Sequence, residues 1–330
     1  MLVSITTVRE LMAAACRAAD VPKDGVDLVV EHYLDGQLRG RTAHGVAKFC
    51  VEARSFSQRH GSPQVVRQHG VLAVVDARRE IGPLSAAFAV DHAIDIARTC
   101  GAGIVGTINT QRYGILASWS ERIARAGLIG IVMNTSPAEA TVPGARTPFL
   151  GVNPLSYAIP TSQEPLVVDM ATTESPMGVL WERRRRGERL PAGCFVDADG
   201  LDTDDPDAAA AVLVFGGHRG FALSLLVQVM TGAMFGFPMS HDVEDTWTTG
   251  YAVVAMDPTV GGRLGEFEAS TTRLVQAVAG VRRHEGGTVR VPGRASATRA
   301  AGAARAGVVD LDEAVLERLR TRAAGDFTSD

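Results

Sequence analysis

The chain has 330 residues, a hydrophobic content of 46%, a charged content of 21% and a formal net charge of −4. This is an ordinary composition for a globular protein long enough for two domains, and it excludes a general attraction to nucleic acid or to an acidic membrane surface. No apolar run approaches the roughly 18 residues of a membrane helix and nothing marks secretion, so we expect a cytoplasmic protein.

Three helices are expected in the first 56 residues. Thr7 and Glu10 have the spacing of a capping box and predict the start of the first helix. Apolar residues at helical spacing over residues 26–34 predict the second. The third begins near Val46, so His44 lies at the junction between two helices.

Strands and helices alternate through the middle of the chain. Strands are expected at residues 72–76, 103–107, 128–134 and 166–168, and helices at residues 84–99 and 115–126. A further short strand is expected to end at Asn153-Pro154, and the strand 166–168 leads into Asp169 and a turn of small residues. The alternation predicts an α/β protein with a mixed or parallel sheet.

The last third of the chain is more varied. The segment 219–236, RGFALSLLVQVMTGAMFG, predicts a strongly apolar and buried helix, and a strand follows at residues 251–256. Residues 285–308 contain few large apolar side chains and predict a surface excursion. A short helix at residues 311–319 is expected near the end.

Residues 101–106, GAGIVG, match the dinucleotide fingerprint G-x-G-x-x-G letter for letter. That fingerprint requires a strand before the glycines and a helix after them. Here the expected helix comes first and the expected strand follows. We therefore interpret Gly101 as the glycine that ends a helix, and we reject a Rossmann site at this position.

The four cysteines are scattered and form no C-x-x-C pair, so neither a disulfide framework nor a metal site is expected. They are predicted to be small buried side chains. These residues are Cys16, Cys50, Cys100 and Cys194.

Two segments resemble those of a known family. They are residues 39–49, RGRTAHGVAKF, and residues 151–173, GVNPLSYAIPTSQEPLVVDMATT. Both are similar to segments of the malate/L-lactate dehydrogenase family of NAD(P)H-dependent 2-oxo acid and cyclic imine reductases, which is unrelated to the Rossmann-type lactate dehydrogenases.

The resemblance covers nearly the whole chain and carries expectations about architecture. It implies the mixed-sheet α/β fold of that family, which is not a classical Rossmann fold, and a homodimer. Residues 1–115 with 285–330 would form a substrate and dimerisation domain, and residues 116–284 a central NAD(P)-binding domain.

His44 is the best candidate for acid–base chemistry, because an imidazole titrates near pH ~6.5. A lone histidine can equally be structural, but the resemblance implies that His44 is the proton donor. Two neighbours depart from the family pattern. Ala43 replaces a serine that bonds the histidine, and Lys48 replaces an arginine. Lysine can still attract a substrate carboxylate, although it lacks the planar fork of arginine.

Arg112 is a larger departure. Residues 109–114 read NTQRYG where the family reads Asn-Ser-Asn-His-Phe-Gly, so Arg112 stands in place of a histidine that faces the substrate. Arginine cannot be an acid or base at neutral pH. It could hold a carboxylate or phosphate, or it could be a surface arginine left after a lost function, and the sequence leaves both open.

NADPH or NADH is the cofactor that the resemblance implies. Arg219 replaces a family lysine and keeps its positive charge, and Arg294 stands where the family has an acidic residue after its Pro-Gly pair. Taken singly, these glycines and prolines are also ordinary turn residues. The expected cofactor-binding residues are Ser136, Asp169, Met170, Ala171, Thr172, Arg219, Pro292 and Gly293.

The arginine run 183–186 is typical of a solvated helix face, because Glu182 and Glu188 flank it, although a ligand patch is an alternative.

The leading hypothesis is an oxidoreductase. It would transfer a hydride from NAD(P)H to a small-molecule carboxylate, with His44 as proton donor and Lys48 and Arg112 holding the substrate carboxylate. Two alternatives remain. One is a divergent member with a specialised imine-reducing or non-redox role in secondary metabolism, and the other is a non-catalytic nucleotide-binding dimer. No nucleic acid or membrane partner is expected.

Overall fold

The computed structural model describes residues 1–282, 284, 285, 287 and 289–328. Its helices are α1 (Ile5–Ala18), α2 (Val26–Leu38), α3 (Val46–Glu52), α4 (Gly82–Cys100), α5 (Leu116–Arg125), α6 (Met177–Arg186), α7 (His218–Thr231), α8 (Leu264–Ala279), α9 (Arg294–Ala306) and α10 (Glu313–Ala323). Short 3₁₀ helices include η1 (Thr42–His44) and η2 (Ala53–Gln58). Its strands are β1 (Leu2–Ser4), β2 (Gln64–His69), β3 (Leu72–Glu80), β4 (Ala102–Thr110), β5 (Ile129–Asn134), β6 (Ala140–Thr141), β7 (Leu155–Ile159), β8 (Leu166–Met170), β9 (Phe195–Val196), β10 (Ala211–Leu213), β11 (Tyr251–Met256) and β12 (Val308–Asp310).

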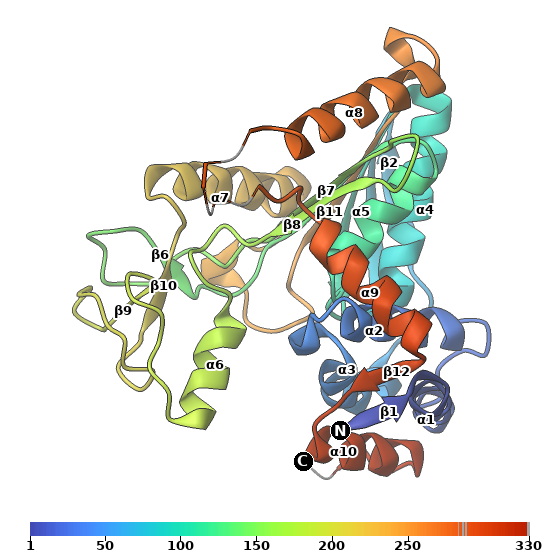
Figure 1. Ribbon diagram of the computed structural model, residues 1–330. Coiled ribbons are helices and arrows are strands. Elements are labelled where there is room, and N and C mark those ends of the chain that lie inside the picture. Colours follow the sequence, from blue (N-terminus) through green and yellow to red (C-terminus); the bar gives the residue numbers. More distant parts are fainter. Residues whose placement is uncertain (283, 286, 288, 329–330) are drawn as a thin grey trace.

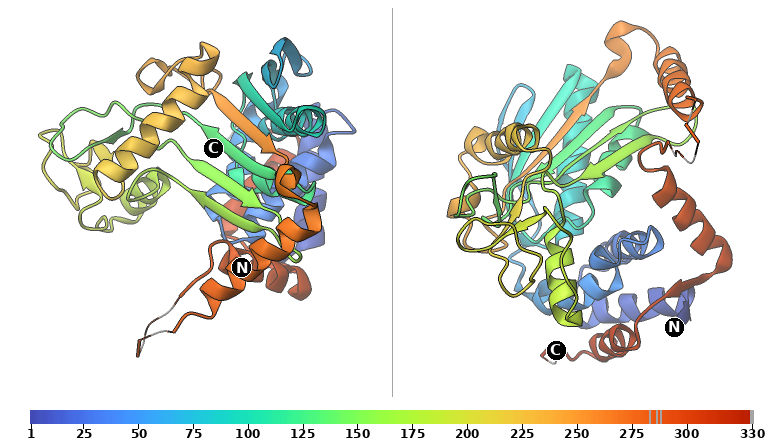
Figure 2. Two further views of the ribbon diagram at one scale, coloured as in Figure 1. Left: turned by 90° about the horizontal axis from the view of Figure 1, so that it is seen from above. Right: turned by 60° about the vertical axis from the view of Figure 1, so that its left-hand side comes forward.

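A seven-stranded mixed sheet with the order β2-β3-β4-β11-β5-β7-β8 forms the centre of the molecule. β3 and β4 run parallel, and each of the other neighbouring pairs is antiparallel. The mixed α/β fold is therefore confirmed. Figures 1 and 2 show the sheet with helices on its faces.

Alternate residues of β11 explain how the sheet is covered. Val253 and Ala255 belong to a core shared with α4 and α5, whereas Ala252 and Val254 pack with Val227 of α7. Successive side chains of a strand point to opposite faces, so α4 and α5 cover one face and α7 lies on the other.

The two ends of the chain meet in one layer. β1 pairs antiparallel with β12, and the Met1 ammonium lies 2.9 Å from a carboxylate oxygen of Asp310. Behind this pair, α1, α2, α3 and α10 share a core that includes Met12, Leu34 and Leu319. The division into two domains at residues 115 and 285 stays a prediction. The strands β4 and β5, which lie before and after residue 115 in the sequence, belong to the same seven-stranded sheet.

A small lobe lies beside the sheet, at the left of Figure 1. It is made by the three-stranded sheet β6-β10-β9 and helix α6. On α6, Arg183 pairs with Glu188, Arg184 with Asp207, and Arg186 with Glu182. These pairs agree with a solvated helix face.

Several predictions hold and several are wrong. Gly101 has φ 83° and ends α4, and β4 follows it, so the inverted order at the glycine motif is confirmed. The capping box at Thr7 is wrong, because α1 begins earlier, at Ile5, directly after β1. The strand ending at Asn153-Pro154 is also wrong: β7 begins after that pair, at Leu155.

The prediction of a fully buried helix at residues 219–236 is wrong as well. Val227 is buried, but Leu225, Leu226 and Val229 of α7 are 44%, 52% and 52% exposed. The predicted surface excursion contains the helix α9, which has no buried residue, while residues 286 and 288 lie outside the described part.

Cys16 and Cys50 are buried as expected, whereas Cys194 is only partly buried and Cys100 is exposed. Among the described residues, no helix is long and apolar enough to cross a membrane, and no group of histidine, cysteine and carboxylate side chains could hold a metal ion.

Candidate active site

His44 ends the 3₁₀ helix η1 in the short connection between α2 and α3. This connection packs tightly on α2, because a Cβ atom at Gly36 would lie 2.6 Å from the carbonyl oxygen of His44. Gln37 adds two bonds: its side-chain oxygen accepts from the Val46 amide, and its amide nitrogen donates to the carbonyl oxygen of Asp310 at 2.9 Å. The C-terminal segment therefore helps to hold the histidine in place.

The charges of three cations act on His44. Its side chain reaches solvent, yet enclosure by protein atoms and the charges of Lys48, Arg41 and Arg112 lower the pKa of His44 to about 4. The structure thus brings the three predicted residues His44, Lys48 and Arg112 together, and adds Arg41. At neutral pH the imidazole of the ligand-free protein is uncharged and stands in a positive field.

Lys48 lies one helical turn from Glu52 on α3, and its ammonium is 3.3 Å from a carboxylate oxygen of Glu52. The lysine side chain is 22% exposed and that of Glu52 is 10% exposed. Lys48 is therefore a partly buried cation with a fixed anionic neighbour.

Arg112 lies in the loop that follows β4, and the backbone of this loop is closely held. A Cβ atom at Gly82 would lie 1.8 Å from the carbonyl oxygen of Arg112. The next residue, Tyr113, accepts from the indole N–H of Trp119 at 2.8 Å and donates its amide to the hydroxyl of Tyr251 at 3.3 Å. The Arg112 guanidinium itself is exposed and donates to the hydroxyl of Thr246 at 3.3 Å.

Asp169 and Met170 end β8, and Ala171 and Thr172 follow in the bend next to the start of α7. The Thr172 carbonyl accepts from the Phe215 amide at 3.1 Å. A Cβ atom at Gly220 would lie 2.9 Å from that carbonyl oxygen, so the first turn of α7 can approach the bend only because residue 220 is glycine. Arg219 lies in this first helical turn and is exposed.

A cavity of about 230 Å³ brings Asp169, Pro292 and Gly293 together. Gly293 has φ 76°, and a Cβ atom there would lie 2.5 Å from the Val167 carbonyl oxygen, so α9 begins directly against β8. Burial raises the pKa of Asp169, and Arg41 and Arg39 oppose this effect. The lining residues are Arg39, Arg41, Ile115, Ala117, Val167, Val168, Asp169, Pro292, Gly293 and Ser296.

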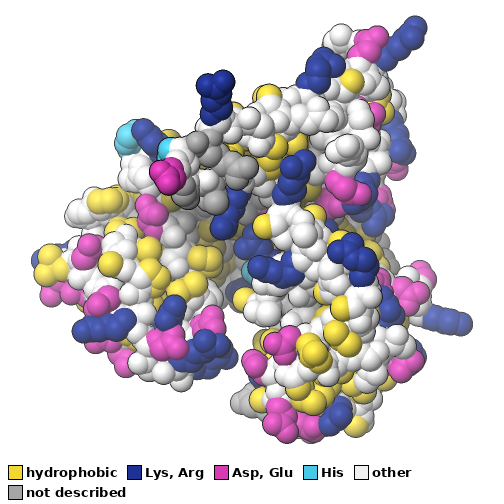
Figure 3. Space-filling view, in the orientation of Figure 1, with side chains coloured by type: hydrophobic (Ala, Val, Ile, Leu, Met, Phe, Trp, Pro, Cys, Tyr) yellow, Lys and Arg dark blue, Asp and Glu magenta, His cyan; other side chains and the backbone are white. Residues whose placement is uncertain are grey.

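Arg41 connects the two parts of the site. It lines this cavity, and its charge also acts on His44. In Figure 3, Lys and Arg side chains gather in the hollow between the small lobe and the rest of the molecule, beside α9. The hollow therefore suits an anionic ligand, and its mixture of cations, one carboxylate and apolar walls fits a phosphate-bearing nucleotide.

Ser136 lies near the same end of the sheet. Its hydroxyl is buried without a hydrogen-bond partner in the described part of the chain, and a Cβ atom at Gly151 would lie 2.3 Å from it. The neighbouring Val152 carbonyl accepts from the amide of Thr172 at 2.9 Å. Ser136 therefore lies beside the segment 151–152, which is bonded to Thr172. Its hydroxyl oxygen is free to bind a ligand.

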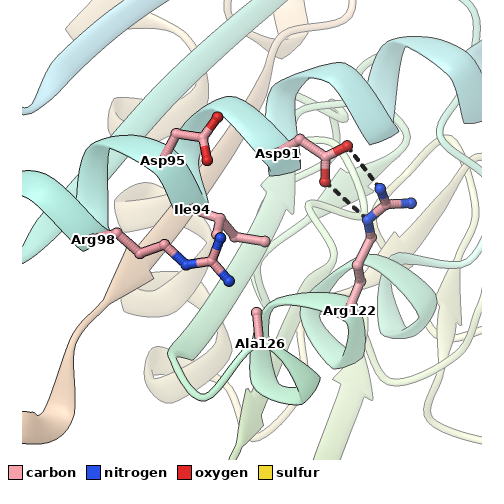
Figure 4. Close-up of a pocket in the computed structure, with 6 residues that line it drawn as sticks. All are labelled: Asp91, Ile94, Asp95, Arg98, Arg122 and Ala126. Atoms are coloured by element: carbon pink, nitrogen blue, oxygen red, sulfur yellow. Dashed lines mark hydrogen bonds and ion pairs between the residues drawn. The ribbon is translucent and has the colours of Figure 1, made fainter.

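A second cavity, of about 300 Å³, lies along α4 and α5 and is lined by none of the predicted residues (Figure 4). Arg122 and Asp91, two of its residues, pair at 2.7 Å and are both well exposed. It is larger than the cavity at Asp169, but it holds no expected site residue and its Arg122 and Asp91 are already paired, so we place the site at His44 and Asp169.

Sequence reasoning missed Arg39, Arg41 and Ser296. The letters RGRTAH did place two arginines just before His44, but nothing in them showed that both side chains would line a cavity shared with β8 and α9.

A model of the family described as malate/L-lactate dehydrogenase matches residues 3–320. An L-sulfolactate dehydrogenase of Methanothermobacter thermautotrophicus is 32% identical, over 92% of this chain and 90% of the relative. A (2R)-3-sulfolactate dehydrogenase (NADP(+)) of Chromohalobacter salexigens is 29% identical, over 98% of each chain.

A solved structure gives the same result in three dimensions. The Δ1-piperideine-2-carboxylate reductase of Pseudomonas syringae is 27% identical and superposes with a TM-score of 0.85, over 98% of this chain and 99% of that one. The similarity therefore includes the central sheet, the small lobe and the paired terminal segments.

Proposed function

The chain belongs to the malate/L-lactate dehydrogenase family and is a nicotinamide-dependent oxidoreductase, and we propose that it reduces the C2 carbonyl of a 2-oxo acid or the C=N bond of a cyclic imino acid. The observation that carries the proposal is Arg41. This residue lines the cavity with Asp169, Pro292 and Gly293, and its charge also lowers the pKa of His44. Arg41 thus links three of the expected cofactor residues with the expected proton donor, which supports the proposal.

Each residue of the site has a role that its chemistry allows. Reduced nicotinamide, when bound, supplies the hydride. Lys48 and Arg112 hold the substrate carboxylate, and His44 gives a proton to the carbonyl oxygen or imine nitrogen. Holding the substrate beside the donor of the proton accounts for much of the acceleration expected.

The low pKa of His44 raises a question about how it becomes a proton donor. In the ligand-free protein Lys48, Arg41 and Arg112 disfavour the imidazolium. A substrate carboxylate placed between these cations offsets their field and makes protonation of His44 easier. Binding of the substrate therefore favours the protonated form of His44, which the reaction requires.

This account predicts a difference between two pH profiles of the reduction. Because kcat/KM reports the free enzyme, it should fall as pH rises above about 4, the pKa of His44. Because kcat reports the complex, where the pKa is higher, kcat should stay high to a higher pH. Initial rates at saturating reduced cofactor would give both profiles, and coincident midpoints would contradict the mechanism.

The first test of the function is titration of the protein with NADPH and with NADH, followed by nicotinamide fluorescence. We expect saturable binding of at least one, and oxidation of that cofactor by a 2-oxo acid or a cyclic imino acid. The relative named as NADP(+)-dependent gives a reason to begin with NADPH. Lack of binding of either at millimolar concentration would overturn the redox proposal.

We also propose a homodimer and a cytoplasmic location. The exposed apolar side chains Leu225, Leu226 and Val229 of α7 support the dimer, since a second copy could cover them. The location rests on composition alone.

A further inference from the structure

Glu52 is a buried carboxylate that the proposed chemistry does not use. It ends α3, and one of its oxygens lies 3.3 Å from the ammonium of Lys48. We propose that Glu52, held by Tyr33, is a positioning residue that fixes the Lys48 ammonium where the substrate carboxylate binds. The inference rests on the proposed function, because it takes Lys48 as a carboxylate-binding residue.

Both oxygens of Glu52 are engaged by different elements. Oε1 faces Lys48 within α3, where residues four apart share a helix face. Oε2 accepts a hydrogen bond from the hydroxyl of Tyr33, which comes from α2. The carboxylate is thereby fixed from two directions, and it can in turn fix the lysine.

The surroundings make this arrangement necessary. Tyr33 is fully buried, and its ring packs edge-on against that of Phe49, with 5.5 Å between the ring centroids. The Phe49 ring packs in the same way against that of Phe56, with 5.8 Å between the centroids. A carboxylate beside such an aromatic cluster is costly unless a cation compensates it. Burial, and then the Glu52 charge, raise the pKa of Tyr33 well above its ordinary value, so its hydroxyl remains a donor.

A lysine needs this help more than an arginine does. Its ammonium is a single charge on a flexible four-carbon stem, whereas the guanidinium of arginine is a rigid fork that matches a carboxylate. With one direction held by Glu52, the remaining N–H groups of Lys48, which meet no other partner among the described residues, can bind substrate. Arg41 and Arg112, which have no carboxylate ion partner in the described part of the chain, keep the site positive.

The test is Glu52→Gln, which keeps the shape of the side chain and removes its charge. We expect KM for the carboxylate substrate to rise by about tenfold or more, with a much smaller change in kcat, because the Lys48 ammonium is no longer held in place and binds the substrate carboxylate less well. Binding of oxalate, measured by calorimetry, should weaken by a similar factor and needs no turnover. The matched control is Glu182→Gln, which breaks an exposed pair with Arg186 of the same spacing on α6 and should change neither value.

A double-mutant cycle separates positioning from a structural role. If Glu52 acts through Lys48, adding Glu52→Gln to Lys48→Met should raise KM no further, and independent additive losses would overturn the proposal. Glu52→Asp, whose shorter side chain keeps the charge, should recover part of the affinity. If Glu52→Gln does not fold, Tyr33→Phe loosens the same carboxylate without removing it, and it should raise KM with a smaller factor.

The outcomes distinguish this proposal from the proposed function. Weaker oxalate binding by the Glu52→Gln variant of a protein that reduces no 2-oxo acid or imine would support the positioning role and overturn the function. A folded Glu52→Gln variant with unchanged KM and oxalate affinity would overturn the positioning role alone. Absence of oxalate binding to the unmodified protein would overturn both.

Discussion

Replacing His44 with asparagine is expected to lower turnover by about 10²- to 10⁴-fold, the usual contribution of a general acid. Asparagine is polar and smaller than histidine, so it fits the η1 turn without overpacking, but it cannot deliver a proton. Steady-state rates with saturating reduced cofactor would measure the loss.

The cofactor should still bind to the His44→Asn variant, because the cavity at Asp169 is formed by other residues. His69→Asn, at an exposed position on β2, is the matched control and should retain normal turnover. Full activity of His44→Asn would show that another group protonates the substrate.

Removing the charge of Arg112 is expected to produce the second large effect. Arg112→Met should raise KM for a 2-oxo acid by about 10- to 100-fold, which corresponds to the loss of one hydrogen bond to a charged group. The loop backbone is held by Gly82, Trp119 and Tyr251, so the side chain can change without loss of the loop. The measurement is the KM of the variant, with its melting temperature as a check on folding.

Arg112→His tests the two interpretations that the sequence left open. If arginine is required by the substrate, this variant should lose activity as Arg112→Met does. If the position merely drifted, the histidine should restore activity toward simple 2-oxo acids. Arg122→Met is the matched control and should leave KM unchanged. Arg122 is an exposed arginine of α5 that pairs with Asp91 of α4.

The sequence was sufficient for elements with a long periodic pattern. α2, α4, β4 and β11 lie where hydrophobic spacing predicts them, and the order of helix and strand around Gly101 was enough to reject a Rossmann site. β1 and β12 could not be predicted, because three residues carry no periodicity and each strand exists only through the other. α9 was missed since its Ala- and Arg-rich sequence offers no apolar face to recognise.

The candidate site divides in a similar way. His44 and Lys48 are near each other in sequence, so a local motif was able to indicate them. Arg41 was not identified, because its importance comes from a cavity that it lines together with residues of the distant segments β8 and α9. Glu52 was not identified either, because its proposed role depends on a hydrogen bond from Tyr33, which lies on another helix.

The pairing of β1 with β12 has a consequence for synthesis. Met1 and Asp310 are separated by 309 positions, so the layer that holds His44 cannot be completed until the ribosome has made residue 310. Domains commonly fold in the order in which they are translated. Here the strands of the central sheet are all made before β12, whereas β1 must wait for β12, so the layer that holds His44 is the later of the two to be completed.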